Sequence, residues 1–156
     1  AENVWSVGTL VRGAWIEAGT RNYPVATSVI TSSDNNYLYR HETGYDDDGS
    51  AMTAYVESGD VELDEGGRFM FMNRMIPDFK FSGDTGSASM DVTIKGKRFP
   101  LEDLSTLATA TVTSSTEQNF LRTRARESVV RVESSGLGFG WRLGDLRFEM
   151  RQDGRR

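Results

Sequence analysis

Few side chains in this sequence could do enzyme chemistry, and the single histidine is the first to consider. The chain has no cysteine, which excludes thiol nucleophiles, disulfides and cysteine-ligated metals. A single histidine, His41, excludes two-histidine metal sites, and any Ser-His-Asp triad would have to include it. His41 lies in the strand-like segment 37–42, where a structural histidine is the more common case. No nucleophile elbow, phosphate-binding glycine loop or dinucleotide fingerprint occurs. We therefore predict no catalytic residue, no cofactor and no enzyme; the acids could supply a glycosidase pair, but no pattern supports one.

A run of acids, Asp46, Asp47 and Asp48, precedes Gly49 and offers the oxygen ligands that Ca²⁺ prefers. The spacing does not fit a calcium-binding loop. With Gly49 at the sixth position, Tyr55 would stand where the closing Glu is required. We interpret the run as a solvated hairpin tip and predict no metal, with an irregular calcium site as the alternative.

Three arginines, Arg122, Arg124 and Arg126, alternate along a strand-like segment near the C-terminus. Alternate residues of a strand share one face and lie about 7 Å apart. Such a row can follow phosphates, meet acids of a neighbouring subunit, or be solvated. The pI of about 4.9 and the lack of interleaved aromatic and basic residues disfavour general nucleic-acid binding. We favour an interface with an acidic surface of an adjacent subunit, of the kind formed by residues 46–48 or 60–62.

The aromatic side chains could form a platform for sugar rings. Trp5, Trp15, Trp141 and several tyrosines are available for stacking. Most aromatics of a small β protein belong to its core, however, and Trp141 precedes an amphipathic segment. We expect Trp141 to be at least partly buried.

Strands are the elements that must position these residues. In 89–95 apolar and polar residues alternate with the period of a half-buried strand, and the same pattern recurs near the C-terminus. The apolar residues of these two strands should face one core: Met90, Val92, Ile94, Leu146, Phe148 and Met150.

The spacing of further strand-like segments predicts an all-β protein, an antiparallel β-sandwich or jelly roll. These segments are 4–16, 36–42, 51–63, 68–76, 108–113, 120–126 and 128–134. The segment 101–104, after Pro100, could form one short turn of helix.

The residue pattern of the chain differs between residues 1–45 and residues 46–156, which we expect to form separate parts. The strands expected in 1–45 resemble those of a propeller blade, whereas 46–156 reads as the sandwich-like domain. A lone blade cannot bury both faces, so the rest of a propeller would lie outside this chain. The first residue is Ala1 and not an initiator Met, which suggests a processed chain or a piece of a longer one.

Charge is unevenly distributed along the 156 residues, whose net charge is -5. Residues 1–67 carry 3 Arg or Lys and 12 Asp or Glu, whereas residues 118–156 carry 9 Arg and 5 acids. Arginine outnumbers lysine 15 to 3, and arginine is enriched at protein interfaces. This pattern favours an assembled protein. No apolar run approaches the roughly 20 residues that span a bilayer, so we expect no membrane partner.

Several separated strings of the sequence resemble the C-terminal part of tail hub or nozzle proteins of short-tailed bacteriophages, a family also described as packaged-DNA stabilisation proteins. The strings are WSVGTLVR (5–12), YLYRHETGYDDDG (37–49), RFMFMNRMIPDF (68–79), WRLGDLR (141–147) and DGRR (153–156). The chain is far shorter than a full nozzle subunit.

The resemblance implies a virion structural protein, made in the host cytoplasm and located in the phage tail. It implies a homo-oligomer, commonly a hexameric ring, that meets an adaptor protein and conducts the genome, with transient contact to DNA. The family's role is mechanical, so no catalytic residue carries over. The alternative function is a carbohydrate-binding β-sandwich module for host recognition.

Overall fold

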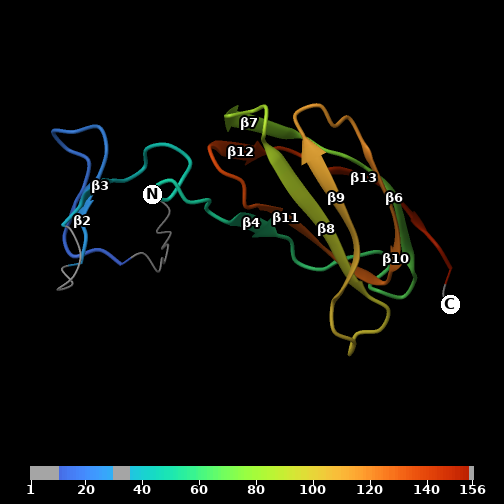
Figure 1. Cartoon of the computed structure of the whole chain (residues 1–156). Helices are drawn as coiled ribbons and strands as arrows, with labels where there is room; N and C mark the ends of the chain where they lie inside the picture. The colour runs from blue at the N-terminus through green and yellow to red at the C-terminus, as the bar shows by residue number, and fades with distance from the viewer. Residues whose placement is uncertain (1–10, 30–35, 155–156) are drawn as a thin grey trace. The chain divides into compact units, whose positions relative to one another are not determined.

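The computed structural model describes residues 11–29 and 36–154, and every regular element in these residues is a β-strand. The all-β prediction is therefore confirmed. The chain divides into two compact units, residues 1–44 and residues 45–156 (Figure 1). Within the described residues there is no helix long and apolar enough to cross a membrane.

The first unit contains a small antiparallel sheet with the strand order β1-β2-β3. Its strands are β1 (Trp15–Ile16), β2 (Val25–Thr27) and β3 (Leu38–Arg40). Of the strand expected over 4–16 only the end is seen, because residues 4–10 lie outside the described residues. No propeller is present among the described residues, and the interpretation of residues 1–45 as one blade stays a prediction.

The second unit is a β-sandwich of antiparallel sheets. One sheet has the order β4-β11-β8-β9, with β5 also paired to β11; the others are β10-β6-β13 and β12-β7. The strands are β4 (Ala54–Glu57), β5 (Val61–Glu62), β6 (Met70–Ile76), β7 (Phe79–Gly83), β8 (Ser89–Lys97), β9 (Ser105–Thr113), β10 (Asn119–Ala125), β11 (Glu127–Ser134), β12 (Phe139–Leu143) and β13 (Arg147–Gln152).

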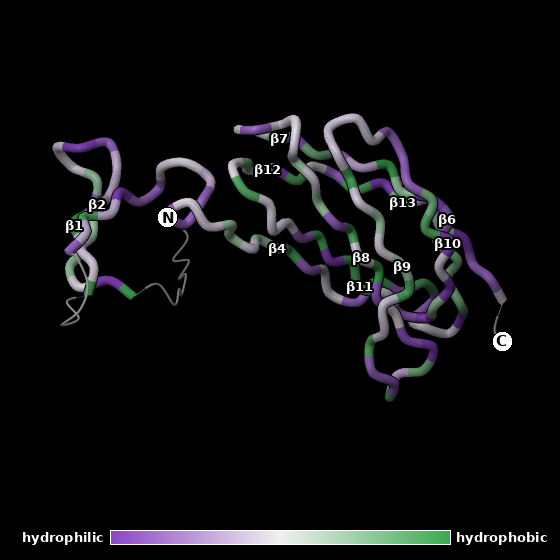
Figure 2. The backbone as a smooth tube through the Cα atoms, in the orientation of Figure 1, coloured by the Kyte–Doolittle hydropathy of each residue, from purple (hydrophilic) through white to green (hydrophobic). Residues whose placement is uncertain are grey.

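The core lies between the five-stranded sheet and the other two. Along β8 hydrophobic and hydrophilic positions alternate (Figure 2), and its apolar side chains are buried. The buried cluster comprises Met70, Met72, Met75, Met90, Val92, Ile94, Val112, Leu121, Val130 and Val132. Leu146 and Phe148 pack against it, as predicted. The prediction for Met150 is wrong, since this side chain is 39% exposed and lies outside the cluster.

The exposure of Met150 fits its place on β13, which is an edge strand of its sheet. Glu149 pairs with Arg74 but Met150 pairs with Met72, so the ladder between β13 and β6 skips Asn73. The extra residue belongs to β6, so this bulge does not interrupt the alternation along β13 itself.

Strands β6 and β7 follow one another along one side of a bent ladder, and β12 and β13 follow one another along the other side. The bend falls at Pro77, which has no N–H to donate to a sheet. Opposite it, the Gly144 amide donates to the Asp78 carbonyl at 2.8 Å. A Cβ at Gly144 would meet the Asp78 carboxyl group, so a larger residue there would require this side chain to move.

Two local predictions need correction. The segment 101–104 has no helix; a turn links the Glu102 amide to the Phe99 carbonyl at 3.0 Å, and Leu101 is fully exposed. Three strands were not expected: β2, β7 and β12. Two of these strands contain or adjoin residues that favour loops. Strand β7 begins shortly after Pro77, and β12 contains Gly140.

Candidate interaction surface on the β10–β6–β13 sheet

Arg122 and Arg124 lie on β10, at one edge of the three-stranded sheet, and Arg126 follows directly after the last residue of this strand. Leu121, Thr123 and Ala125 are buried, and the residues that alternate with them are not. Arg122 and Arg124 are exposed and Arg126 is half-buried. The burial pattern therefore agrees with a shared outer face for the three arginines.

Two of these arginines contact their own chain. The guanidinium carbons of Arg124 and Arg126 lie 3.9 and 4.5 Å from the centroid of the Phe69 ring, which is 5% exposed. Arg124 Nε is 2.6 Å from Asp153 Oδ2, and Arg126 Nη1 donates to the carbonyls of residues 66 and 67. These two side chains fasten the turn at 63–68 and the C-terminal segment to β10. Their role at a subunit interface stays a prediction.

Arg122 differs from its two neighbours. Its φ is 50°, in the left-handed region that a residue with a long side chain rarely adopts. The pairing explains this conformation: Phe120 pairs with Arg74 and Thr123 with Met72, so β10 has two residues opposite one of β6. Arg122 thus projects from a bulge at the edge of the sheet and is exposed.

Both bulges of this sheet meet at Asn73. The β10 bulge places two residues opposite Asn73, and the β13 register skips the same residue. Bulges redirect side chains and occur often beside binding sites. The outer face of the sheet is accordingly irregular around Asn73.

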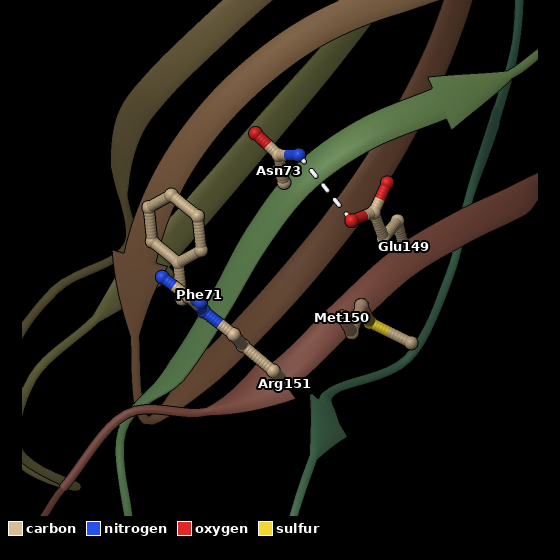
Figure 3. A pocket seen from close by; sticks show the side chains of 5 residues that line it. All are labelled: Phe71, Asn73, Glu149, Met150 and Arg151. Carbon is tan, nitrogen blue, oxygen red and sulfur yellow. Dashed lines mark hydrogen bonds between the residues drawn. The ribbon is translucent and has the colours of Figure 1, made fainter.

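A depression of about 350 Å³ opens beside Asn73, between β6 and β13. Figure 3 shows the side chains that line it, with Arg151 extending from β13 toward Phe71 on β6. The lining residues are Phe71, Asn73, Glu149, Met150 and Arg151. The sequence analysis did not identify this group, because its members come from strands about 75 residues apart and meet only through the register.

Glu149 is held in the wall of the depression by neighbouring side chains. Asn73 Nδ2 donates to Glu149 Oε1 at 3.4 Å (Figure 3). Arg74 Nε lies 3.1 Å from Glu149 Oε2, and Arg74 Nη1 donates to Gln118 Oε1 at 3.0 Å. These contacts fix the carboxylate while leaving acceptor capacity, because an ionised carboxylate offers about four lone-pair sites.

A separate charged cluster lies around Glu57 on the five-stranded sheet. Lys95 Nζ is 2.7 Å from Glu57 Oε2, and Arg131 bridges Glu57 and Glu133 at 3.4 and 2.6 Å. The hydrogen bond from Lys95 holds the pKa of Glu57 below its usual value. The hydrogen bond to Glu133 raises the pKa of Arg131. Both shifts favour the charged forms, so the cluster suits ion pairing and not proton transfer near neutral pH.

The acidic run forms a tight turn. Asp47 and Ser50 exchange two backbone hydrogen bonds of 2.9 Å, with Asp48 and Gly49 both at positive φ between them. Asp46 instead accepts a 2.7 Å hydrogen bond at Oδ1 from the Gly138 amide. Among residues 11–29 and 36–154 no group of three or more His, Asp or Glu side chains is placed to hold a metal ion.

The remaining candidate residues are the single histidine and the tryptophans considered for sugar stacking. In the first unit His41 Nε2 accepts a hydrogen bond from Arg12 Nε at 3.2 Å, and the Trp15 ring lies 4.6 Å from the histidine ring. In the second unit Trp141 is half-buried, as expected, and donates from Nε1 to Ser134 Oγ at 2.9 Å. Trp5 lies outside the described residues. A tryptophan platform for sugars therefore stays a prediction.

Comparison with known proteins adds no assignment. No protein-family model matches the chain, and a search of curated proteins finds no relative.

Proposed function

We propose that this chain is a structural protein of a short-tailed bacteriophage tail, part of a hub or nozzle ring that holds packaged DNA and conducts it during ejection. It acts in the virion after synthesis in the host cytoplasm, as a homo-oligomer beside an adaptor protein, and has no catalytic role. Support from the sequence comes from the five strings that resemble this family.

The observation that carries the proposal is the separation of charge across the second unit. Residues 45–57 contain four acids and no Arg or Lys. They include β4, at the edge of the five-stranded sheet opposite to β9. Strand β10, with its arginines, packs beside β9 instead. A unit with an acidic edge and a basic edge can associate head to tail, and head-to-tail contacts generate rings when they close.

Exposure and contacts within the chain support a choice among the arginines for the proposed subunit interface. Arg124 and Arg126 already bind Phe69 and nearby backbone. Arg122 and Arg147 are both exposed, on β10 and β13 of the same sheet. We therefore assign the intersubunit contacts mainly to Arg122 and Arg147, facing acids such as those of residues 46–48.

The test replaces both arginines by glutamine (Arg122→Gln with Arg147→Gln) and compares the protein with Arg142→Gln, which removes an exposed arginine of β12. Oligomeric state is followed by analytical ultracentrifugation at rising salt, and DNA affinity by fluorescence anisotropy. The proposal expects weaker assembly at low salt for the double variant alone, since salt screens exposed charges. Unchanged assembly combined with lost DNA affinity would overturn the interface role and assign these arginines to the DNA channel.

A further inference from the structure

The depression between β6 and β13 combines an apolar surface with fixed polar groups. Phe71 and Met150 supply the apolar surface, while Asn73, Glu149 and Arg151 supply an amide, a carboxylate and a guanidinium group. Its volume of about 350 Å³ falls in the range of small-molecule sites, which are lined by apolar side chains and a few convergent polar groups. The tail function proposed above uses none of these five residues.

We propose that this depression binds a neutral saccharide unit. A sugar ring presents an apolar C–H face and a rim of hydroxyl groups, each of which both donates and accepts hydrogen bonds. Phe71 matches the C–H face, and Met150 lines the depression on the side of Glu149. Glu149 accepts from hydroxyl groups and Arg151 donates to them, so one wall offers both partners that a pair of neighbouring hydroxyls requires.

The geometry prepares these groups for binding. Contacts from Asn73 and Arg74 hold Glu149 in place. The Arg151 guanidinium carbon lies 5.0 Å from the Phe71 ring centroid, so this contact holds the guanidinium group beside the ring in the wall of the depression (Figure 3). Groups fixed before binding lose less conformational entropy on binding, which raises affinity.

The same wall disfavours a phosphodiester ligand. The Glu149 carboxylate would repel a phosphate placed against Arg151. A neutral sugar avoids this repulsion and uses the carboxylate as an acceptor. Glu149 therefore favours a saccharide over single-stranded nucleic acid, although an aromatic ring beside an arginine could also stack with a base.

The test uses the six methionine methyl groups as reporters. The full chain is labelled with ¹³C-methyl methionine and titrated separately with methyl α-glucopyranoside, methyl β-galactopyranoside, N-acetylglucosamine and a thymidine oligonucleotide. Met150 lines the depression, whereas Met52 is exposed outside it and serves as the internal control. The Met150 signal is assigned with a Met150→Leu variant.

We expect at least one sugar to shift the Met150 signal saturably while the Met52 signal stays in place. Phe71→Ala should weaken that binding about tenfold, the scale of one aromatic contact. The matched control is Tyr55→Ala, which removes another aromatic ring paired with an arginine, 3.8 Å from Arg131 on the other sheet. Glu149→Gln, which preserves the shape of the side chain, should also weaken binding.

Two results would overturn the saccharide site: a Met150 shift with the oligonucleotide but with no sugar, or no Met150 shift with any of the three sugars. Equal loss of binding in Phe71→Ala and Tyr55→Ala would assign the effect to the fold and likewise reject the site. The titrations are run at high salt, where the charged contacts proposed between subunits are screened but a neutral sugar can still bind, so this site and the proposed ring can fail separately.

Discussion

Replacing Ile94 by Asp tests the strand register on which the sandwich core depends. Ile94 is 0% exposed and belongs to the buried cluster. On β8 it pairs with Val130 of β11 on one side and with Ala108 of β9 on the other. An aspartate at this position would place a carboxyl group among apolar side chains with no cation in register beside it.

The cost follows from two contributions. Keeping the carboxyl neutral at pH 7 requires raising its pKa by about three units, and each unit corresponds to about 1.4 kcal/mol. Loss of the buried isoleucine adds about 2 kcal/mol. We therefore expect a destabilisation of more than about 3 kcal/mol, against a total stability of about 5–15 kcal/mol for a domain. The melting temperature should fall by more than about 12 °C.

The assay is thermal unfolding followed by circular dichroism, with Thr93→Asp as the matched control. Thr93 is the preceding residue of β8, lies on the outer face and pairs with Arg131, so an aspartate there meets solvent and a cation. The Ile94→Asp penalty should also grow as the pH rises above about 4. The unfolded carboxyl then releases its proton while the folded one, with its raised pKa, retains it. A variant that melts within a degree or two of the parent would refute the register.

Three further substitutions test other parts of the second unit. Phe69→Ala removes the ring beneath two arginine side chains and should cost about 3–5 kcal/mol in urea unfolding; a loss below about 1 kcal/mol would contradict its anchoring role. Gly96→Ala puts a Cβ within 2.6 Å of a β9 leucine side chain and should cost about 1–3 kcal/mol. Gly86→Ala, where the nearest atom is 3.6 Å away, should be almost neutral, and equal effects would refute the packing argument. Glu57→Gln should lower the free energy of unfolding at pH 7, because Lys95 lowers the pKa of the folded Glu57 carboxyl and so stabilises the fold while that carboxyl is charged. This stabilisation is lost as the pH falls below about 4.3, so the variant should lose less stability in acid than the parent does. An equal loss of stability in acid for the variant and the parent would contradict this.

The sequence predicted strands well where alternation was uninterrupted. Strand β8 was expected over 89–95 and spans Ser89–Lys97, and its apolar residues are buried. The pattern failed at Met150, which alternates with polar residues as a core position would but is 39% exposed on the edge strand β13. The place of a strand in its sheet cannot be read from the alternation within that strand.

The arginines of β10 illustrate a second limit. Period-2 spacing alone predicted that they share the outer face, where Arg122 and Arg124 are exposed and Arg126 is half-buried. Their partners could not be predicted in this way, because Phe69 and Asp153 reach them through the turn at 63–68 and through pairing of β13 with β6. A cation that looks available in the sequence can therefore be engaged within its own chain.

The depression beside Asn73 could not be predicted for the same reason. Phe71 alternates with the buried Met70 and Met72, which is enough to place it on the outer face of a strand. Its neighbours Glu149 and Arg151 are fixed only by the register between β6 and β13. A chemical site assembled across strands becomes visible only once that register is known.

Native mass spectrometry of the full chain, at high protein concentration and low ionic strength, tests the proposed assembly most directly. The account predicts a closed ring, six subunits as the family resemblance implies, that dissociates as the salt concentration rises. A protein that stays monomeric at every concentration and salt level, and is absent from phage particles, would contradict it.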